Sequence, residues 1–180
     1  HPASFVDASG RLVTENTVPA MANGQQVGTY ELDPNTGQVT FKPNKSFYGT
    51  PDPVVVQVSD ADGKAHRARY QPKVTQVTPR SINAESTGLQ GQAQSGKPTF
   101  TAGDQQIPID MSKSMTFENG MNTLEVANEG TYTINSDDTI TFKPLKQFTG
   151  KATPVTVKRV DTNGTEVTAT YTQNVTKVTP

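Results

Sequence analysis

The 180-residue chain contains no cysteine and no tryptophan, so disulfides and thiolate chemistry are excluded. It also lacks a dominant charge, since sixteen Lys and Arg residues stand against seventeen Asp and Glu residues. A nucleic-acid-binding protein needs a basic face, and the sequence predicts none. No apolar run approaches the roughly 20 residues that a membrane-spanning helix requires. We therefore expect neither nucleic acid nor a membrane as a partner.

Threonine is abundant instead, with 27 of the 180 residues, beside 14 glycines and 13 prolines. Threonine and valine suit pleated, half-buried surfaces, whereas proline and glycine interrupt them at turns. No sustained helical period occurs along the chain. The composition predicts an all-β protein with many turns.

The sequence contains an internal repeat. "GTYELDPNTGQVTFKP" begins at Gly28 and "GTYTINSDDTITFKP" at Gly130. The correspondence continues at a spacing of 101 residues in three further pairs, Phe41 with Phe142, Tyr70 with Tyr171, and Pro79 with Pro180. Such self-similarity indicates tandem domains. We predict two antiparallel β-sandwich modules, 1–79 and 80–180, joined by a short Pro-containing linker, the first module being N-terminally truncated or variant.

Within each module, apolar residues alternate with polar ones, which predicts strands with one buried face. The turns "DPNTG" and "SDD" close a first hairpin, and "DADG" and "DTNG" close a second. The repeated inward positions form the expected core: Tyr30, Leu32, Val39, Phe41, Phe47, Val54, Val56 and Tyr70 in the first module, and Tyr132, Ile134, Ile140, Phe142, Phe148, Val155, Val157 and Tyr171 in the second.

Two positions and one segment depart from a simple repeat. The strand that holds Val54 and Val56 continues to Val58, whose counterpart is Arg159, so the end of this strand is expected to be exposed. Phe5 is expected to correspond to Phe117, with about ten residues of difference in the intervening length. The segment "RSINAESTGLQGQAQSGKPTF" could be a flexible linker, but we favour the interpretation that it opens the second module.

The acidic residues sit mainly in turns, where carboxylates usually cap backbone amides: Asp33, Asp60, Asp62, Asp137, Asp138 and Asp161. A glycosidase would need two acids facing each other across a cleft. "DADG" and "DTNG" look like pieces of a calcium loop, but the twelfth position, which should be Glu, is Gln71 in one and Thr172 in the other. We expect no catalytic, cofactor-binding or metal site.

Histidine offers no metal site or catalytic triad. His1 is terminal, and His66 corresponds to Val167, which indicates a packed or half-exposed strand residue. A Lys–Asn isopeptide bond, which occurs in some surface adhesins, would have a plausible position at Asn174, but the counterpart of Asn174 is Lys73.

Sugar-binding modules stack aromatic side chains against their ligand, yet nearly all Tyr and Phe residues here fall on the inward phase. Tyr48 is the exception, since it follows an inward Phe and corresponds to Thr149. It is the candidate contact residue.

The combination of "GTY", "TFKP", "F-x-G", "D-x-x-G-x-x-x-x-A-x-Y" and terminal "VTP" resembles the tandem fibril repeats of streptococcal CshA-type surface adhesins. The resemblance covers essentially all of 80–180 and most of 28–79. "YTQNVT" departs from it, because a proline is expected after "YT", as in "YQPKVT" of the first module.

This resemblance implies a secreted protein, anchored to a Gram-positive cell wall through a region outside this sequence, whose repeats build a surface fibril. Its implied partners are neighbouring repeats in the same chain and, through the parent adhesin, host extracellular-matrix glycoproteins or other bacteria. We expect a structural stalk rather than an enzyme. The alternative is a repeat that itself binds a host matrix protein or glycan, which an exposed aromatic or apolar patch would favour.

Overall fold

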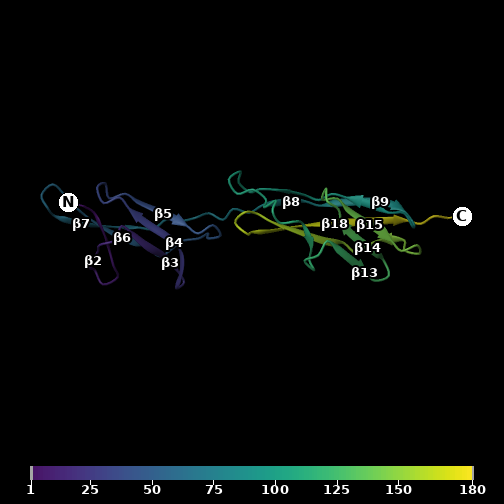
Figure 1. Cartoon of the computed structure of the whole chain (residues 1–180), viewed down its shortest axis with the longest axis horizontal. Helices are drawn as coiled ribbons and strands as arrows, with labels where there is room; N and C mark the ends of the chain where they lie inside the picture. The colour runs from purple at the N-terminus through teal and green to yellow at the C-terminus, as the bar shows by residue number, and fades with distance from the viewer. Residues whose placement is uncertain (1, 180) are drawn as a thin grey trace. The chain divides into compact units, whose positions relative to one another are not determined.

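A computed structural model describes residues 2–179, so His1 and Pro180 lie outside the described residues. The chain divides into two compact units, 1–76 and 77–180, close to the boundary expected between 79 and 80 (Figure 1). Strands and turns make up the regular structure of the described range, in agreement with the expected all-β class. A helix able to cross a membrane is not found anywhere between residues 2 and 179.

Unit 1 consists of two antiparallel sheets, with strand orders β2-β1-β6-β7 and β3-β4-β5. The strands are β1 (Ser4–Val6), β2 (Leu12–Val13), β3 (Thr17–Ala22), β4 (Gln25–Leu32), β5 (Val39–Pro43), β6 (Val54–Ser59) and β7 (Ala65–Tyr70). The repeated motif "GTYEL" lies on β4 and "VTFKP" on β5, and they form the expected hairpin with Tyr30 opposite Phe41. Asn23 and Gly24 both have positive φ at the β3–β4 turn, as a two-residue hairpin turn requires.

Unit 2 repeats this plan with additional strands. One sheet has the order β12-β17-β18-β16 and the other β10-β15-β14-β13, with a separate β8–β11 pair. The strands are β8 (Arg80–Ile82), β9 (Ala84–Leu89), β10 (Gln94–Gly96), β11 (Thr99–Thr101), β12 (Thr116–Phe117), β13 (Thr123–Val126), β14 (Gly130–Ile134), β15 (Ile140–Pro144), β16 (Gly150–Lys151), β17 (Val155–Val160) and β18 (Glu166–Thr176).

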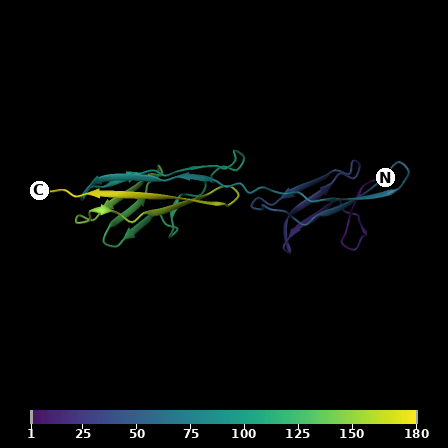
Figure 2. The ribbon, with the colours of Figure 1, turned by 180° about the vertical axis from the view of Figure 1, so that it is seen from behind.

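The segment between the two repeats is part of unit 2, as favoured from the sequence. Strand β9 pairs with the long strand β18 in parallel, from Ala84 opposite Tyr171 to Leu89 opposite Thr176. Strand β10 pairs with the outer edge of β15. Figures 1 and 2 both show teal β9 running beside yellow β18. The parallel pair departs from the purely antiparallel arrangement that was expected.

The glycine of each "GTY" motif is required by close packing of the backbone. A Cβ atom at Gly28 would lie 2.3 Å from the carbonyl oxygen of Lys42, and one at Gly130 would lie 2.3 Å from that of Lys143. Both distances are far below van der Waals contact, so a larger residue would push the hairpin strands apart. The repeated glycine therefore fixes how closely the two strands of the first hairpin approach each other.

Each unit has its own hydrophobic core between its sheets. In unit 1, Tyr30, Leu32, Val54 and Val56 are buried, whereas four of the repeated positions are half-buried: Val39, Phe41, Phe47 and Tyr70. In unit 2, seven of the repeated positions are buried and Phe148 is half-buried; the seven are Tyr132, Ile134, Ile140, Phe142, Val155, Val157 and Tyr171. The extra strands β9 and β10 cover part of the second core. Gly96 of β10, for example, lies against the ring of Tyr171.

Pairing registers show that Phe5 and Phe117 are equivalent. Phe5 lies opposite Val56 and Phe117 opposite Val157, and both phenylalanines are buried in their cores. The correspondence expected from the sequence is therefore confirmed. Part of the difference in length lies between β1 and β3, where unit 1 has the additional strand β2. The rest lies in the longer β3–β4 hairpin, because Gly28 pairs with Ala20 whereas Gly130 pairs with Val126.

Candidate functional site

The carboxylates in the second hairpin turn of each unit cap backbone amides. In unit 1, Asp60 Oδ1 accepts hydrogen bonds from the amides of Asp62 and Lys64, each 2.9 Å long. In unit 2, Asp161 Oδ1 accepts from the amides of Asn163 and Thr165 at the same distance. These bonds satisfy amides of the turn itself, as expected for turn carboxylates. Among residues 2–179 no group of three or more His, Asp or Glu side chains is placed to hold a metal ion.

His66 lies on β7 with 57% of its side chain exposed, which fits the expected half-exposed strand residue and not a packed one. Its Nε2 lies 2.7 Å from Asp60 Oδ2. The hydrogen bond from His66, together with those from the turn amides, lowers the pKa of Asp60 below its usual 3.8. In unit 2 the equivalent of His66 is the buried Val167. Asp161 Oδ2 therefore lacks this partner, and it is buried with no hydrogen bond to any of the described residues.

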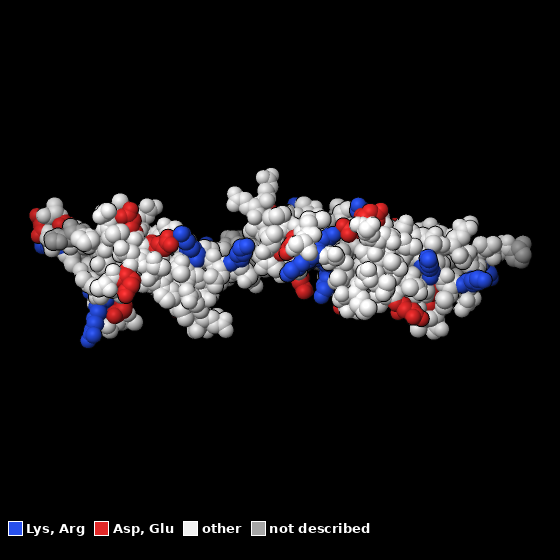
Figure 3. All heavy atoms as spheres, in the orientation of Figure 1, with Lys and Arg blue, Asp and Glu red and all other residues white. Residues whose placement is uncertain are grey.

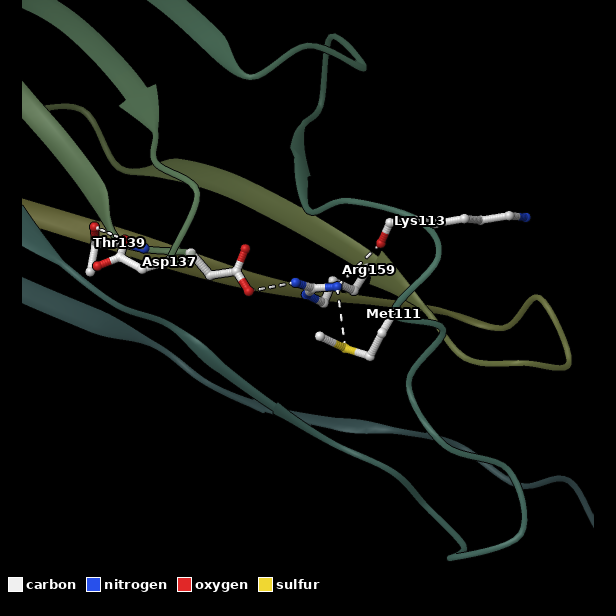
Figure 4. Close-up of polar contacts among 6 residues, drawn as sticks. Met111, Lys113, Asp137, Thr139 and Arg159 are labelled. Carbon is white, nitrogen blue, oxygen red and sulfur yellow. Dashed lines mark hydrogen bonds and ion pairs between the residues drawn. The ribbon is translucent and has the colours of Figure 1, made fainter.

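Arg159 is buried, which contradicts the expectation that this end of the strand is exposed. Its side chain is only 6% exposed, and Nη2 donates to Asp138 Oδ2 at 2.6 Å (Figure 4). Nη1 donates to the carbonyl oxygen of Lys113 at 3.2 Å and contacts Met111 Sδ at 3.8 Å. The segment that carries Met111 and Lys113 covers the end of β17, so the guanidinium is enclosed rather than solvated. The expectation of exposure does hold for the counterpart Val58, which is 38% exposed.

The ion pair replaces an apolar contact of unit 1. Asp138 occupies the position of Gly37, and both adopt a left-handed conformation, with φ of 68° and 78°. In unit 1 a Cβ atom at Gly37 would lie 3.1 Å from Val58 Cγ1. Asp tolerates this conformation better than most residues, and here its carboxylate gains a buried cation. The neighbouring Asp137, in contrast, caps Thr139 and does not contact the guanidinium.

A hollow of about 210 Å³ lies beside this pair and is lined by Lys97, Phe100, Met115 and Arg159 among others. Pockets that bind small molecules usually measure about 300 to 1,000 Å³ and enclose most of the ligand. This hollow is smaller, and its one buried cation is already bound to Asp138. The arrangement is therefore suited to holding the turn in place and not to binding a substrate.

Asn174, the candidate for an isopeptide bond, is exposed on β18 and lies opposite Lys151 of β16. Glu85 of β9 points to the same outer face, because it lies opposite Thr172, two residues before Asn174. A hollow of about 360 Å³ on this face is lined by these polar side chains. The cluster is solvated, unlike the enclosed surroundings that favour reaction between side chains.

Tyr48 is 55% exposed, as expected from its unshared position. Its counterpart Thr149 is exposed as well. All seven Phe and five Tyr residues lie within the described range, and Tyr48 alone among them is exposed. Figure 3 shows Lys, Arg, Asp and Glu side chains of both signs spread over the visible face of each unit.

Sequence reasoning missed a buried polar network in unit 2. The hydroxyl of Tyr132 donates to Gln173 Oε1 at 2.7 Å, and Gln173 Nε2 donates to the carbonyl oxygen of Tyr171 at 2.7 Å. The hydroxyl groups of Tyr171 and Ser86 are 2.5 Å apart. Burial is the main cause that raises the pKa of both tyrosines. Gln173 lies two residues after Tyr171 on β18, so the alternation of the strand places it on the same buried face. This spacing could have predicted a buried polar side chain.

The fold and these sites are those of a tandem β-sandwich repeat protein whose polar clusters serve its turns and core. A family model, the surface adhesin CshA repetitive domain, matches residues 1–74 and 76–175, one match in each unit. The chain therefore belongs to this family of adhesin repeats. Membership implies a secreted, cell-surface location and a role as adjacent repeats of an adhesin.

Among solved structures, repeat domain 13 of the fibrillar adhesin CshA from Streptococcus gordonii is 57% identical, with 38% of this chain and 87% of that domain covered and a TM-score of 0.22. Domains EC22–24 of mouse cadherin-23 are 14% identical, with 98% and 53% covered and a TM-score of 0.35. Domains 1–6 of the surface layer protein SbsC are 17% identical, with 98% and 23% covered and a TM-score of 0.36. No curated protein matches the chain.

Proposed function

We propose that the two units are spacer repeats of a surface fibril, which hold an adhesive region of the parent protein away from the cell wall. The observation that carries this proposal is the partition of side chains: every aromatic residue except Tyr48 is buried or half-buried. A repeat that bound a ligand through its own face would be expected to expose an aromatic or apolar patch.

Physical reasons favour repetition for such a spacer. A single β-sandwich core cannot grow indefinitely, so a long structure requires several cores in series. Each unit has a separate core. Burial of the repeated tyrosines, phenylalanines and valines stabilises each core without disulfides. We include in the proposal that the parent protein is anchored to a Gram-positive cell wall, and that the repeats have no catalytic activity and need no cofactor.

The second candidate function is direct adhesion through Tyr48. An exposed tyrosine offers a rigid, amphipathic surface for a sugar ring or a partner side chain. The residue is present in one unit only, because Thr149 replaces it in the other. Contact with host extracellular-matrix glycoproteins or other bacteria would then depend on unit 1.

Titration of the folded two-unit chain against immobilised extracellular-matrix glycoproteins and glycans distinguishes the two functions. The spacer proposal predicts flat responses up to roughly millimolar concentration. Saturable binding at about micromolar concentration or below, abolished by Tyr48→Ala and retained in the matched variant Thr149→Ala, would overturn it in favour of adhesion. Circular dichroism of each variant confirms that the chain remains folded.

A further inference from the structure

Each repeat ends in Val-Thr-Pro, at Val77–Pro79 and again from Val178. The first of these segments is held by the unit that follows it. A Cβ atom at Gly103 would lie 2.4 Å from the carbonyl oxygen of Thr78 and 3.0 Å from Val77 Cγ1. Pro79 is buried. The end of the first repeat is thus packed against unit 2 by its last three residues.

Space, not backbone conformation, explains the glycine at 103. Its φ is not in the left-handed region, so any residue could adopt its backbone geometry. The adjoining ladder places Arg80 of β8 opposite Thr101 of β11. Beyond this pair the segments that hold Thr78 and Gly103 lie side by side. The absence of a side chain at Gly103 lets the backbone of Thr78 approach closely. A side chain at this position would displace the segment.

The second Val-Thr segment is held by hydrogen bonds to its own unit, and its valine is more exposed than that of the first. Unit 2 holds its beginning through Gln90, whose amide donates to the carbonyl oxygen of Thr176 at 2.8 Å. The side-chain oxygen of Gln90 accepts from the amide of Val178 at 3.1 Å. Val178 itself is 52% exposed. Its backbone amide is held by Gln90, and about half of its surface remains open to a partner.

We propose that Val178 and Thr179 form a docking element for the loop 102–104 of a following repeat of the same fold. The occupant is a further copy of unit 2, because this loop already receives the same tripeptide once in this chain. Each joint then consists of one repeat's terminal segment clamped by the next repeat. Val74 still pairs with Gly49 of unit 1. Only Thr75 and Gln76 therefore remain between the two clamped stretches.

This joint does not depend on whether the repeats are spacers or binders, since it uses neither Tyr48 nor the outer sheet faces. It predicts that successive repeats are linked by about two free residues, far fewer than a flexible linker would need for independent motion. Testing this joint requires two proteins: one in which the segment from Val178 is free, and one in which a following repeat can cover it.

The first experiment uses the two-unit chain. Methyl groups of Val77 and Val178 are followed by NMR in the presence of a soluble gadolinium chelate, which broadens exposed methyls. We expect Val178 to be broadened strongly and Val77 weakly, with a nuclear Overhauser contact from Val77 to Gly103. Equal broadening of the two valines would overturn the assignment of Val77 to unit 2.

The second experiment extends the chain by one repeat, as residues 1–180 followed directly by a copy of 80–180. Val178 is expected to become as protected as Val77 and to contact the appended copy of Gly103. Val178 remaining as exposed as in the shorter chain would overturn the proposal, and so would contact with any other surface.

Substitutions then test the clamp in the extended chain. Val178→Asp is expected to uncouple the tumbling of the last two repeats, seen in backbone ¹⁵N relaxation. The matched control is Met121→Asp, at an apolar side chain that is 58% exposed in the loop between β12 and β13. The same effect from both variants would refute the docking role of Val178. Since Val178 is exposed in the shorter chain, its substitution should not unfold unit 2.

Discussion

Replacing the ion pair of unit 2 by the apolar pair of unit 1 tests how the two repeats accommodate different residues at equivalent positions. The variants are Arg159→Val, Asp138→Gly and the double variant, which recreates the Val58 and Gly37 combination. Each single change removes one partner of a contact whose other member stays in place. The double change restores a combination that the same fold already uses.

The magnitudes follow from burial. Removing one partner of a buried ion pair costs about 3–5 kcal/mol. The Asp138 side chain is 34% exposed, and Arg159 keeps its bond to Lys113, so we expect about 2–3 kcal/mol for Asp138→Gly. Arg159→Val leaves a carboxylate that can turn to water, and should cost about 1–2 kcal/mol. The double variant should lie within about 1 kcal/mol of the original, so the two positions should be coupled by at least about 2 kcal/mol.

Urea unfolding followed through NMR signals of unit 2 measures the free energies of unfolding. Glu166→Gln serves as the control, because its pair with Lys158 is long, at 3.9 Å, and exposed. Breaking such a surface pair should cost less than about 1 kcal/mol. A double variant as unstable as the sum of the two single variants would refute the reasoning, since it would show that the two positions are not coupled.

Three further predictions concern other sites. Gly130→Ala should destabilise unit 2 by about 2–3 kcal/mol, measured by urea unfolding, because the new Cβ would meet the carbonyl of Lys143. Burial raises the pKa of Tyr132 above 10.0 and so favours its neutral form in the folded state, and the stability of unit 2 should therefore fall as pH rises past 10.0. Tyr132→Phe should weaken this fall, although the lost hydrogen bond costs about 1 kcal/mol at neutral pH. The pKa of Asp60 is lowered by His66, so its contribution should be present above pH 3.8 and lost below it, and Asp60→Asn should flatten the acid dependence of thermal unfolding of unit 1.

Much of the fold was predictable because the sequence repeats and alternates. The hairpin of Tyr30 and Phe41 follows from a period of two and a glycine-containing turn, and both signals are local. The two copies also supported each other, because a position assigned to the core in one copy had to be apolar in the other as well. Turn carboxylates such as Asp60 were also predictable, because the capping amides lie two and four residues along the same chain.

Contacts between distant segments were not predictable in this way. Arg159 was expected at an exposed strand end because its counterpart is Val58, but the segment around Met111 covers it. That segment lies some 50 residues earlier, and no periodic pattern shows that it crosses the end of β17. The parallel pairing of β9 with β18 was missed for the same reason, since register between distant strands is fixed by tertiary packing.

A difference between the two copies can also change one member of a contacting pair and keep the other. His66 accompanies Asp60 in unit 1, and its replacement by Val167 leaves one oxygen of Asp161 without a partner. An unpaired buried oxygen costs roughly 1–3 kcal/mol. Asp161 is nevertheless retained, because its other oxygen caps two amides of the turn. The hairpin turn thus constrains the sequence more strongly than the strand beside it, and this explains why "D-x-x-G" recurs in both repeats while the facing strand residue is free to change.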